Sequence, residues 1–367
     1  MNKVFCTGTG VFTPLGNTPD ELFDAVREGR SAFRLHEGWP EPYYASLFER
    51  STFSGPSFFD YIALQAAREA SKGMDLSSPR VGLVLSTIKG EIEKLGKADV
   101  SLAASARRLA DSLGVQTPPV VVSNACISGL AALVQGMRMI RSGAYDHVLV
   151  VGAELQSRFV VTGFQSLKAL SQRPCRPFDA AREGLNLGEA AAAMLLSRYS
   201  GASALSGQGE ESAWELVSGA IRNDANHISG PSRTGEGSYN ALRCVMEGVK
   251  PEELAFVNVH GTATPYNDQM EAVALSRAGL ETVPVNALKG VFGHTMGAAG
   301  ILESLVSMLA CEQGVVLPTR GFSTMGVEPA VCVSARERKT DKKAFVKLLS
   351  GFGGVNGALL FRKGGAA

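Results

Sequence analysis

The chain has 367 residues, 45% of them hydrophobic and 19% charged, which is enough for a large buried core in one domain or in two fused halves. Its formal net charge of +1 excludes a global electrostatic attraction to nucleic acid or to an anionic membrane surface. The opening MNKVFCTGTGVFTPLG is typical of a short strand and a glycine turn rather than of a secretory signal. Apolar runs stay below the ~18 residues of a membrane span, so we expect no span and a cytoplasmic protein.

The six cysteines are scattered along the chain, without a CxxC pair or a spacing typical of a metal cluster. In a chain of this length they predict neither a disulfide framework nor a metal site. Most of them should be inert thiols, because a free cysteine packs as a small hydrophobic residue. A single cysteine in a special setting is therefore informative.

Short apolar runs typical of buried strands alternate with longer segments of helical spacing. In chain order we expect a helix at 59–72, strands at 81–85 and 120–122, a helix at 129–141, strands at 148–151, 192–196 and 256–259, a helix at 298–312 and a strand at 358–361. Buried strands that alternate with helices predict an α/β fold built around largely parallel sheets.

Two segments share a pattern in which an apolar strand runs into a loop of small residues and then into a helix rich in Ala and Gly. They are VVVSNACISGLAALVQGMRMI at 120–140 and VPVNALKGVFGHTMGAAGILESLVSML at 283–309. Cys126 and His294 lie at the two loop-to-helix junctions, so a duplicated α/β half would bring them to one central site. We expect the halves at residues 1–230 and 231–367, because the polar, Gly-rich stretch 227–238 is the best candidate for a connection.

The junction around Cys126 could carry chemistry or could simply be a tight turn that needs a small residue. Unpaired N–H groups and the dipole of the following helix favour a thiolate there, which predicts a lowered pKa. Of the five histidines, His260 and His294 follow strands in runs of small residues that packing does not require. A cysteine at a helix start and two such histidines form a candidate catalytic constellation. The other three histidines are expected to be structural, although the surroundings of His227 also resemble the rim of a site.

Five segments occur in the order found in β-ketoacyl-ACP synthases. They are NACISGLAAL, CRPFDAAREGLNLGEAAAAMLL, VNVHGTATPYND, NALKGVFGHTMGAAGILES and SGFGGVNGALL. The resemblance spans nearly the whole chain, and several motifs in one order are more specific than any one of them. It implies a thiolase-like layered αβαβα fold built from two similar halves, and therefore an enzyme of the acyltransferase class.

The resemblance also implies a role for each residue that matches a family motif. Cys126 matches the acyl-accepting nucleophile, and His260 and His294 match the two active-site histidines. Among the supporting positions, Lys289 would tune the charge of the site and Glu303 would order it. Phe352 would gate the site and supply a backbone N–H to the oxyanion. Thr262 and Thr264 match positions at the pantetheine entrance, and Lys168 matches a carrier-docking position.

In such a synthase an acyl group is transferred to Cys126, and a malonyl thioester then loses carbon dioxide and attacks it in a decarboxylative Claisen condensation. The resemblance implies no metal and no other cofactor, because both substrates are carried on the phosphopantetheine of acyl carrier protein. It also implies a homodimer, or a heterodimer with a second ketosynthase-like chain. No nucleic acid and no membrane span are expected.

Some features depart from the family pattern and leave alternatives open. The chain is shorter than typical members, the segment before Cys126 differs in length and composition, and STFSGPSFFD at 51–60 replaces a basic docking cluster. Fatty-acid and polyketide or aryl-polyene pathways both remain open. A non-elongating chain-length partner is the alternative from a different class, although such partners usually lack the nucleophilic cysteine. A thiolase or a priming synthase would carry a second cysteine near GFGG, where Phe352 and Asn356 stand instead.

Overall fold

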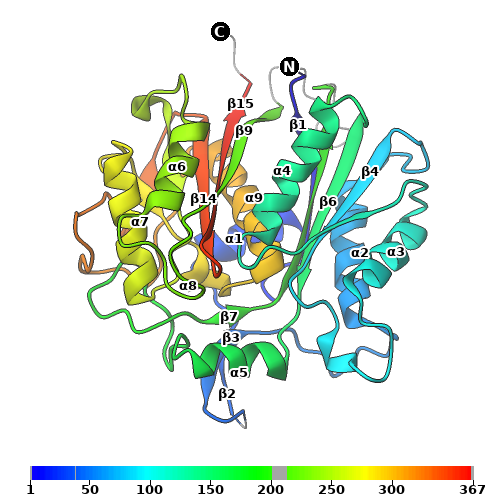
Figure 1. The fold of residues 1–367 in the computed structure, drawn as a ribbon, viewed down its shortest axis with the longest axis horizontal. Helices are drawn as coiled ribbons and strands as arrows, with labels where there is room; N and C mark the ends of the chain where they lie inside the picture. The colour runs from blue at the N-terminus through cyan, green and yellow to red at the C-terminus, as the bar shows by residue number, and fades with distance from the viewer. Residues whose placement is uncertain (1, 38, 201–212, 365–367) are drawn as a thin grey trace.

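The computed structural model describes residues 2–37, 39–200 and 213–364. A ten-stranded sheet runs through the molecule, in the order β11-β10-β14-β15-β9-β1-β8-β6-β4-β5 (Figure 1). The half of the sheet built from the earlier part of the chain contains β1 (Phe5–Phe12), β4 (Val81–Ser86), β5 (Val120–Val122), β6 (His147–Glu154) and β8 (Ala190–Ser197). The other half contains β9 (Trp214–Asn223), β10 (Phe256–Asn258), β11 (Val285–Asn286), β14 (Ala344–Gly351) and β15 (Val355–Lys363).

The two halves of the sheet repeat one topology. Each half contributes five strands, which we number 1 to 5 in chain order. From the outer edge of the sheet inward, their order is 3-2-4-5-1 in both halves. The third, second and fourth strands are parallel to one another, and the fifth is antiparallel to both of its neighbours, in each half alike. This repetition confirms the duplication that the two similar segments predicted.

The division between the halves lies earlier than expected. β9 precedes the expected division at residues 230 and 231, yet it pairs with β15 along its whole length. Among the described residues, its strand pairing with the first half is limited to two positions, where Phe5 faces Glu215 and Cys6 faces Trp214. Strand pairing therefore divides the chain between β8 and β9, and the polar stretch 227–238 lies inside the second half.

The sheet is mixed, whereas largely parallel sheets were expected. Only Phe352, Gly353 and Gly354 connect β14 to β15, and so short a connection can join only antiparallel strands. Parallel pairing is confined to the strands joined through helices, such as β4 with β6 and β10 with β14. The GFGG turn that produces the antiparallel pair also belongs to the candidate site.

Helices form three layers around the two halves of the sheet. Helices α2 (Phe58–Ala70) and α3 (Leu102–Leu113) cover the outer face of the first half, and α6 (Glu236–Val245) and α7 (Pro265–Arg277) cover that of the second. Between the halves lie α4 (Ser128–Arg141) and α9 (Ala299–Glu312), with α1 (Pro19–Arg27) packed on α9. The order helix, sheet, helix, sheet, helix is the layered αβαβα arrangement.

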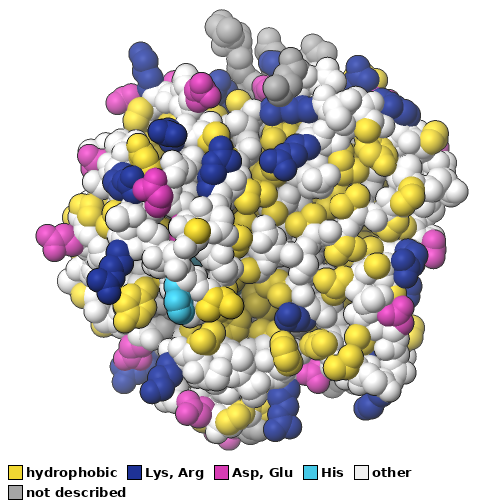
Figure 2. Space-filling view, in the orientation of Figure 1, with side chains coloured by type: hydrophobic (Ala, Val, Ile, Leu, Met, Phe, Trp, Pro, Cys, Tyr) yellow, Lys and Arg dark blue, Asp and Glu magenta, His cyan; other side chains and the backbone are white. Residues whose placement is uncertain are grey.

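The strand at the outer edge of the first half, β5, is open to pairing with a strand of another chain. β5 is the last strand in the sheet order, has β4 as its only strand neighbour among the described residues, and consists of three half-buried valines. Figure 2 shows hydrophobic side chains gathered along the middle of the face on which α4 lies. An unpaired valine edge beside an apolar surface is typical of a strand that another chain covers.

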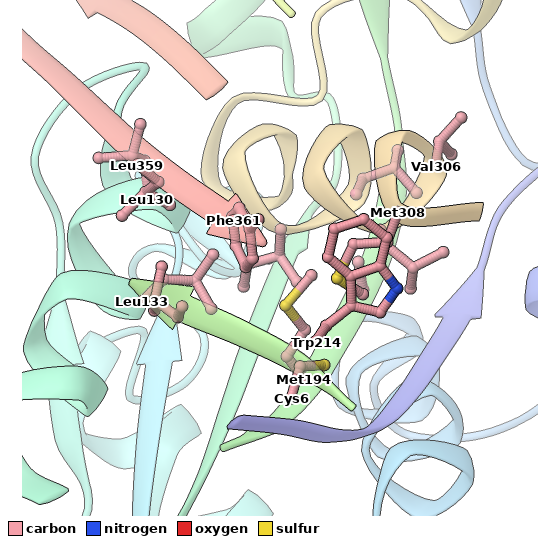
Figure 3. Close-up of a cluster of buried hydrophobic side chains, with 14 of the residues drawn as sticks. Cys6, Leu130, Leu133, Met194, Trp214, Val306, Met308, Leu359 and Phe361 are labelled. Carbon is pink, nitrogen blue, oxygen red and sulfur yellow. The ribbon is translucent and has the colours of Figure 1, made fainter. Parts of the chain in front are cut away.

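The largest core cluster fills the middle layer. It joins Leu130 and Leu133 of α4 to Val306 and Met308 of α9, and both to side chains from the two halves of the sheet (Figure 3). Gly129 and Gly300 permit this contact, because a Cβ atom on Gly300 would lie 2.1 Å from the backbone nitrogen of Leu130. The helices that follow the two junctions therefore pack almost backbone to backbone.

The remaining elements are the small sheet of β2 (Phe33–His36), β3 (Tyr43–Ser46) and β7 (Leu187–Gly188), the pair β12 (Val315–Val316) and β13 (Arg338–Lys339), helices α5 (Arg158–Ser166) and α8 (Lys289–Phe292), and the short helices η1 (Ile92–Lys94), η3 (Pro251–Glu253) and η4 (Met296–Ala298). Of these, β2, β3, β7 and α5 lie at the lower end of the molecule in Figure 1. Within residues 2–37, 39–200 and 213–364, every helix is too short or too polar to cross a membrane.

Candidate active site

A strained turn presents Cys126 between β5 and α4. Ala125 has a φ of 45°, a left-handed conformation that is uncommon for a residue with a Cβ atom. Ser128 holds this turn, because its Oγ accepts from the backbone N–H of Asn124 at 2.7 Å and donates to the carbonyl of Ala125 at 2.6 Å. Cys126 is thus fixed two residues before α4 begins.

The two histidines reach Cys126 from the second half of the chain. His260 follows β10, and His294 lies between α8 and η4. The Cys126 sulfur and one ring nitrogen of each histidine lie within 4.8 Å of one another. The two imidazole rings are 5.1 Å apart and nearly perpendicular, at 81°. The convergence of the two junctions on one central site is therefore confirmed.

The predicted lowering of the Cys126 pKa is wrong. Burial raises the pKa of the Cys126 thiol to about 11, against the opposing effects of the Lys289 charge and of the N–H groups of Phe352 and Cys126 itself. Only 7% of the residue is exposed. The loss of hydration of the thiolate therefore outweighs the helix start on which the prediction rested.

Both histidines are neutral at pH 7. Burial and the nearby charges of Lys289 and Lys347 hold the pKa of His260 and of His294 well below 6.5. The backbone N–H of Met296 donates to Nδ1 of His294 at 3.3 Å, so the ring hydrogen of His294 is on Nε2. That Nε2 is buried and has no partner among the described residues, which leaves it as a hydrogen-bond donor for a bound molecule.

Buried charged groups fix the backbone around His260. Glu271 accepts the N–H groups of His260 and Gly261 at 2.6 and 2.7 Å. Lys289 donates to the carbonyl of His260 and to Oε1 of Glu303, both at 2.7 Å. The side chains of Lys289 and Glu303 are completely buried. Hydrogen bonds to buried side chains therefore fix both the backbone N–H and the backbone carbonyl of His260.

Phe352 lies beside the nucleophile, in the turn between β14 and β15. Its backbone N–H opposes the rise of the Cys126 pKa, and a Cβ atom on the preceding Gly351 would come within 3.1 Å of the Cys126 nitrogen. The Phe352 side chain is partly exposed, and its ring centroid is 5.7 Å from that of Phe164. The backbone N–H groups of Cys126 and Phe352 thus both lie close enough to the sulfur to lower the pKa of the thiol against the effect of burial.

A cavity of about 580 Å³ leads from the surface to these residues. Its floor contains Cys126, His260 and His294, and Phe352 also lines it. Other lining residues include Thr262 and Thr264, whose hydroxyls are 2.9 Å apart, Lys168 near the mouth, and residues 227–231. The predicted site residues thus meet in or directly behind one cavity, and His227 lies on its wall, where its surroundings in the sequence placed it.

Residues 89–202 match the model of the N-terminal domain of β-ketoacyl synthases, and residues 214–323 match the model of the C-terminal domain. The chain belongs to the β-ketoacyl synthase family. It is 28% identical to 3-oxoacyl-[acyl-carrier-protein] synthase 2 of Vibrio cholerae over 98% of this chain and 99% of that protein. It is 29% identical to the actinorhodin polyketide putative β-ketoacyl synthase 1 of Streptomyces coelicolor over 98% of this chain and 88% of that protein.

Solved β-ketoacyl synthases share the whole architecture. A β-ketoacyl synthase from Burkholderia phymatum has a TM-score of 0.87 and 27% identity, covering 99% of this chain and all of that one. The structure described as the ishigamide ketosynthase/chain length factor has a TM-score of 0.87 and 26% identity, with the same coverage. The expected thiolase-like layered fold is therefore confirmed.

Two buried charged residues of this ketosynthase were missed by the sequence interpretation. Glu271 lies in α7, six residues after the HGTATP segment ends, and Lys347 lies in the middle of β14. Lys347 could have been found from the run AFVKLLSG, in which one lysine interrupts an otherwise apolar strand. Glu271 gave no comparable signal, because a glutamate in a helix usually faces water.

Proposed function

We propose that this chain is a β-ketoacyl-[acyl-carrier-protein] synthase that uses Cys126 as its nucleophile and His260 and His294 as donors to the malonyl substrate. The observation that carries the proposal is the meeting of one sulfur and two neutral imidazoles within 4.8 Å at the floor of a cavity. One group can carry the acyl chain, and the other two can bind a developing negative charge. A carbon–carbon bond-forming acyltransferase needs both functions at one point.

Acyl transfer is the first half of the reaction. The Cys126 sulfur attacks the thioester carbonyl of the acyl carrier, and its proton passes to a neutral imidazole. The N–H groups of Cys126 and Phe352 stabilise the tetrahedral oxyanion, where loss of one donor typically costs about 2.7–4 kcal/mol. The bond from the carbonyl carbon to the pantetheine sulfur then breaks, and the imidazolium returns the proton to that sulfur. The carrier leaves as its free thiol, and the acyl group stays on Cys126.

Condensation is the second half. The bond between the malonyl carboxylate and its α-carbon breaks, carbon dioxide leaves, and the electron pair becomes an enolate. His294 Nε2 and His260 donate to the enolate oxygen, which is formed from the thioester carbonyl. The enolate carbon then attacks the acyl carbonyl on Cys126, and the bond to the cysteine sulfur breaks. Neutral histidines suit this role, because an imidazole that keeps its hydrogen donates to the oxygen without protonating the carbon.

The cavity suits a substrate carried on phosphopantetheine. Thr262 and Thr264 offer hydroxyls along its wall to the amide groups of the pantetheine arm, and Phe352 can gate the passage toward Cys126. Lys168 near the mouth would meet the acidic surface of an acyl carrier protein. We propose no metal or other cofactor, because a metal bound to Cys126 would occupy the nucleophile.

We propose that two copies of the chain pair through β5 and the apolar surface beside α4. One side of the half-buried valine edge of β5 has no strand neighbour in the part of the chain that the structure describes, and a second β5 can cover it, extending the sheet across the dimer. A heterodimer with a second ketosynthase-like chain would use the same surface. The mass of the natural chain in native mass spectrometry should be twice that of the monomer, and a monomeric mass at micromolar concentration would contradict this proposal.

Both fatty-acid and polyketide or aryl-polyene pathways suit the proposed chemistry, and we propose that it takes place in the cytoplasm. The relatives carry names from fatty-acid and from polyketide synthesis. A non-elongating chain-length partner is disfavoured, because the nucleophile and both histidines are present and meet in the cavity.

Intact-mass spectrometry tests the proposal directly. The chain is incubated with a panel of acyl-carrier thioesters of different lengths in the presence of a chelator, and malonyl-carrier is then added. We expect a mass increase equal to one acyl group, followed by release of a β-ketoacyl-carrier product two carbons longer. A panel in which no acyl group loads, or in which loaded groups are never extended, would overturn the proposed function.

A further inference from the structure

Lys347 is a buried cation with no place in the reaction derived above. It lies in β14 with its side chain completely buried. Its Nζ donates to Oε2 of Glu303 at 2.6 Å and to the carbonyls of Val259 and Leu348 at 3.2 and 3.1 Å. Burial of a charge costs several kcal/mol unless the site compensates for it. An apolar residue at this position in the strand would avoid that desolvation cost.

Lys347 belongs to a cluster of three charged groups behind His260. One carboxylate oxygen of Glu303 accepts a hydrogen bond from Lys289, and the other accepts one from Lys347. Two ammonium groups and one carboxylate leave the cluster with one net positive charge. Lys289 alone would have formed a neutral pair with Glu303, so the excess charge comes from Lys347.

Other titratable groups that face the cluster are Glu271 of α7, the two histidines, and the thiols of Cys126 and Cys175, on which the charge of Lys289 acts. Burial and the neighbouring Asp268 raise the pKa of Glu271, which weakens its negative charge near neutral pH. Burial also lowers the pKa of Lys347, and the charge of Glu303 opposes this effect. The positive charges of Lys289 and Lys347 both act on His260 and His294, in the direction that keeps each imidazole neutral.

Lys347 also contacts the strand that positions His260. β10 and β14 are parallel, and Lys347 lies in register with Asn258, two residues before His260. Its ammonium group holds the carbonyl of Val259, while Lys289 holds the carbonyl of His260 itself. The two lysines therefore bind successive carbonyls at the point where β10 enters the active site.

We propose that Lys347 is a positioning residue for malonyl decarboxylation, which holds the end of β10 and gives the buried cluster behind His260 its one net positive charge. This inference rests on the proposed function. In the malonyl ground state the negative charge lies on the carboxylate that leaves, whereas in the enolate it lies on the oxygen beside His260. The positive charge of the cluster therefore stabilises the enolate more than the ground state. Acyl transfer uses the N–H groups of Cys126 and Phe352 and depends less on this cluster.

The first test compares the natural chain with Lys347→Met, which replaces the lysine by an apolar side chain of similar length. We expect malonyl-carrier decarboxylation to fall at least tenfold in kcat, with a much smaller change in KM and with acyl loading of Cys126 still measurable. We also expect the acid limb of the pH profile to move to higher pH by about half a unit or more, because loss of a nearby cation raises the pKa of the histidines. A role in stability alone would lower the melting temperature without moving this limb.

The control is Glu303→Gln combined with Lys347→Met, which removes both members of one ion pair and restores the net charge of +1 through Lys289. Its acid limb should return to that of the natural chain, although its rate stays below that of the natural chain because the Val259 contact is lost. If Lys347→Met does not fold, this double variant still tests the charge, because the amide oxygen introduced at position 303 can still accept a hydrogen bond from Lys289.

The proposal is overturned if Lys347→Met decarboxylates at the natural rate with an unchanged pH profile, or if the acid limb of the double variant moves by half a unit or more. Failure of the proposed function has a different signature. In that case the natural chain itself neither loads acyl groups nor decarboxylates malonyl-carrier.

Discussion

Replacing Cys126 with alanine should abolish acyl loading while leaving the fold intact. Acyl transfer requires a nucleophilic atom at this position, and the methyl group of alanine provides none. The cost in folding free energy should be about 1 kcal/mol, because only one buried sulfur atom is removed. The measurement is the intact mass after incubation with an acyl-carrier thioester that loads the natural chain, together with a thermal unfolding curve.

Cys6→Ala is the matched control. Cys6 is also buried, but it lies in β1, away from the cavity. Its variant should lose a similar amount of stability and still load one acyl group. The Cys126→Ala variant should also keep malonyl decarboxylation, because the two imidazoles remain in place. An acyl mass on Cys126→Ala, resistant to denaturation, would show that another residue is the nucleophile and would refute the assignment.

The elements with continuous apolar faces could be predicted from the sequence. β4, β6, β8, α4 and α9 lie where the apolar runs placed them, because each is buried on nearly every side. β14 was missed, because Lys347 interrupts its apolar run and makes it look like a surface segment. The antiparallel pairing of β14 with β15 was also missed, since it depends on a three-residue turn that composition does not reveal.

The catalytic constellation was predictable because its chemistry lies in short motifs. Cys126, His260 and His294 each stand among small residues that leave room around a reactive side chain. The electrostatics of the site were not predictable in the same way. The pKa of the Cys126 thiol depends on how completely the folded chain removes water, and the charge behind His260 depends on a lysine from a strand far along the sequence. Such effects appear only when distant segments meet.

Replacing either His260 or His294 with alanine should stop condensation while Cys126 still loads an acyl group. Each imidazole would donate to the enolate oxygen, and loss of one such donor typically lowers kcat by about 10²–10³-fold. The two half-reactions are measured separately, by acyl mass on the protein and by carbon dioxide release from malonyl-carrier. Because the pKa of both histidines lies well below 6.5, decarboxylation by the natural chain should keep its rate as the pH falls to 6.5.

His36→Ala is the control for these variants, because His36 lies in β2 of the small sheet and outside the cavity. It should retain both half-reactions. Decarboxylation at the natural rate in His260→Ala and His294→Ala would remove both histidines from the reaction. Loss of acyl loading together with decarboxylation would instead place them in the first transfer, where the proton of the Cys126 thiol has to leave a group whose pKa is about 11. Loading that persists while decarboxylation fails is the expected result, because the imidazole that remains in each variant can still accept the thiol proton.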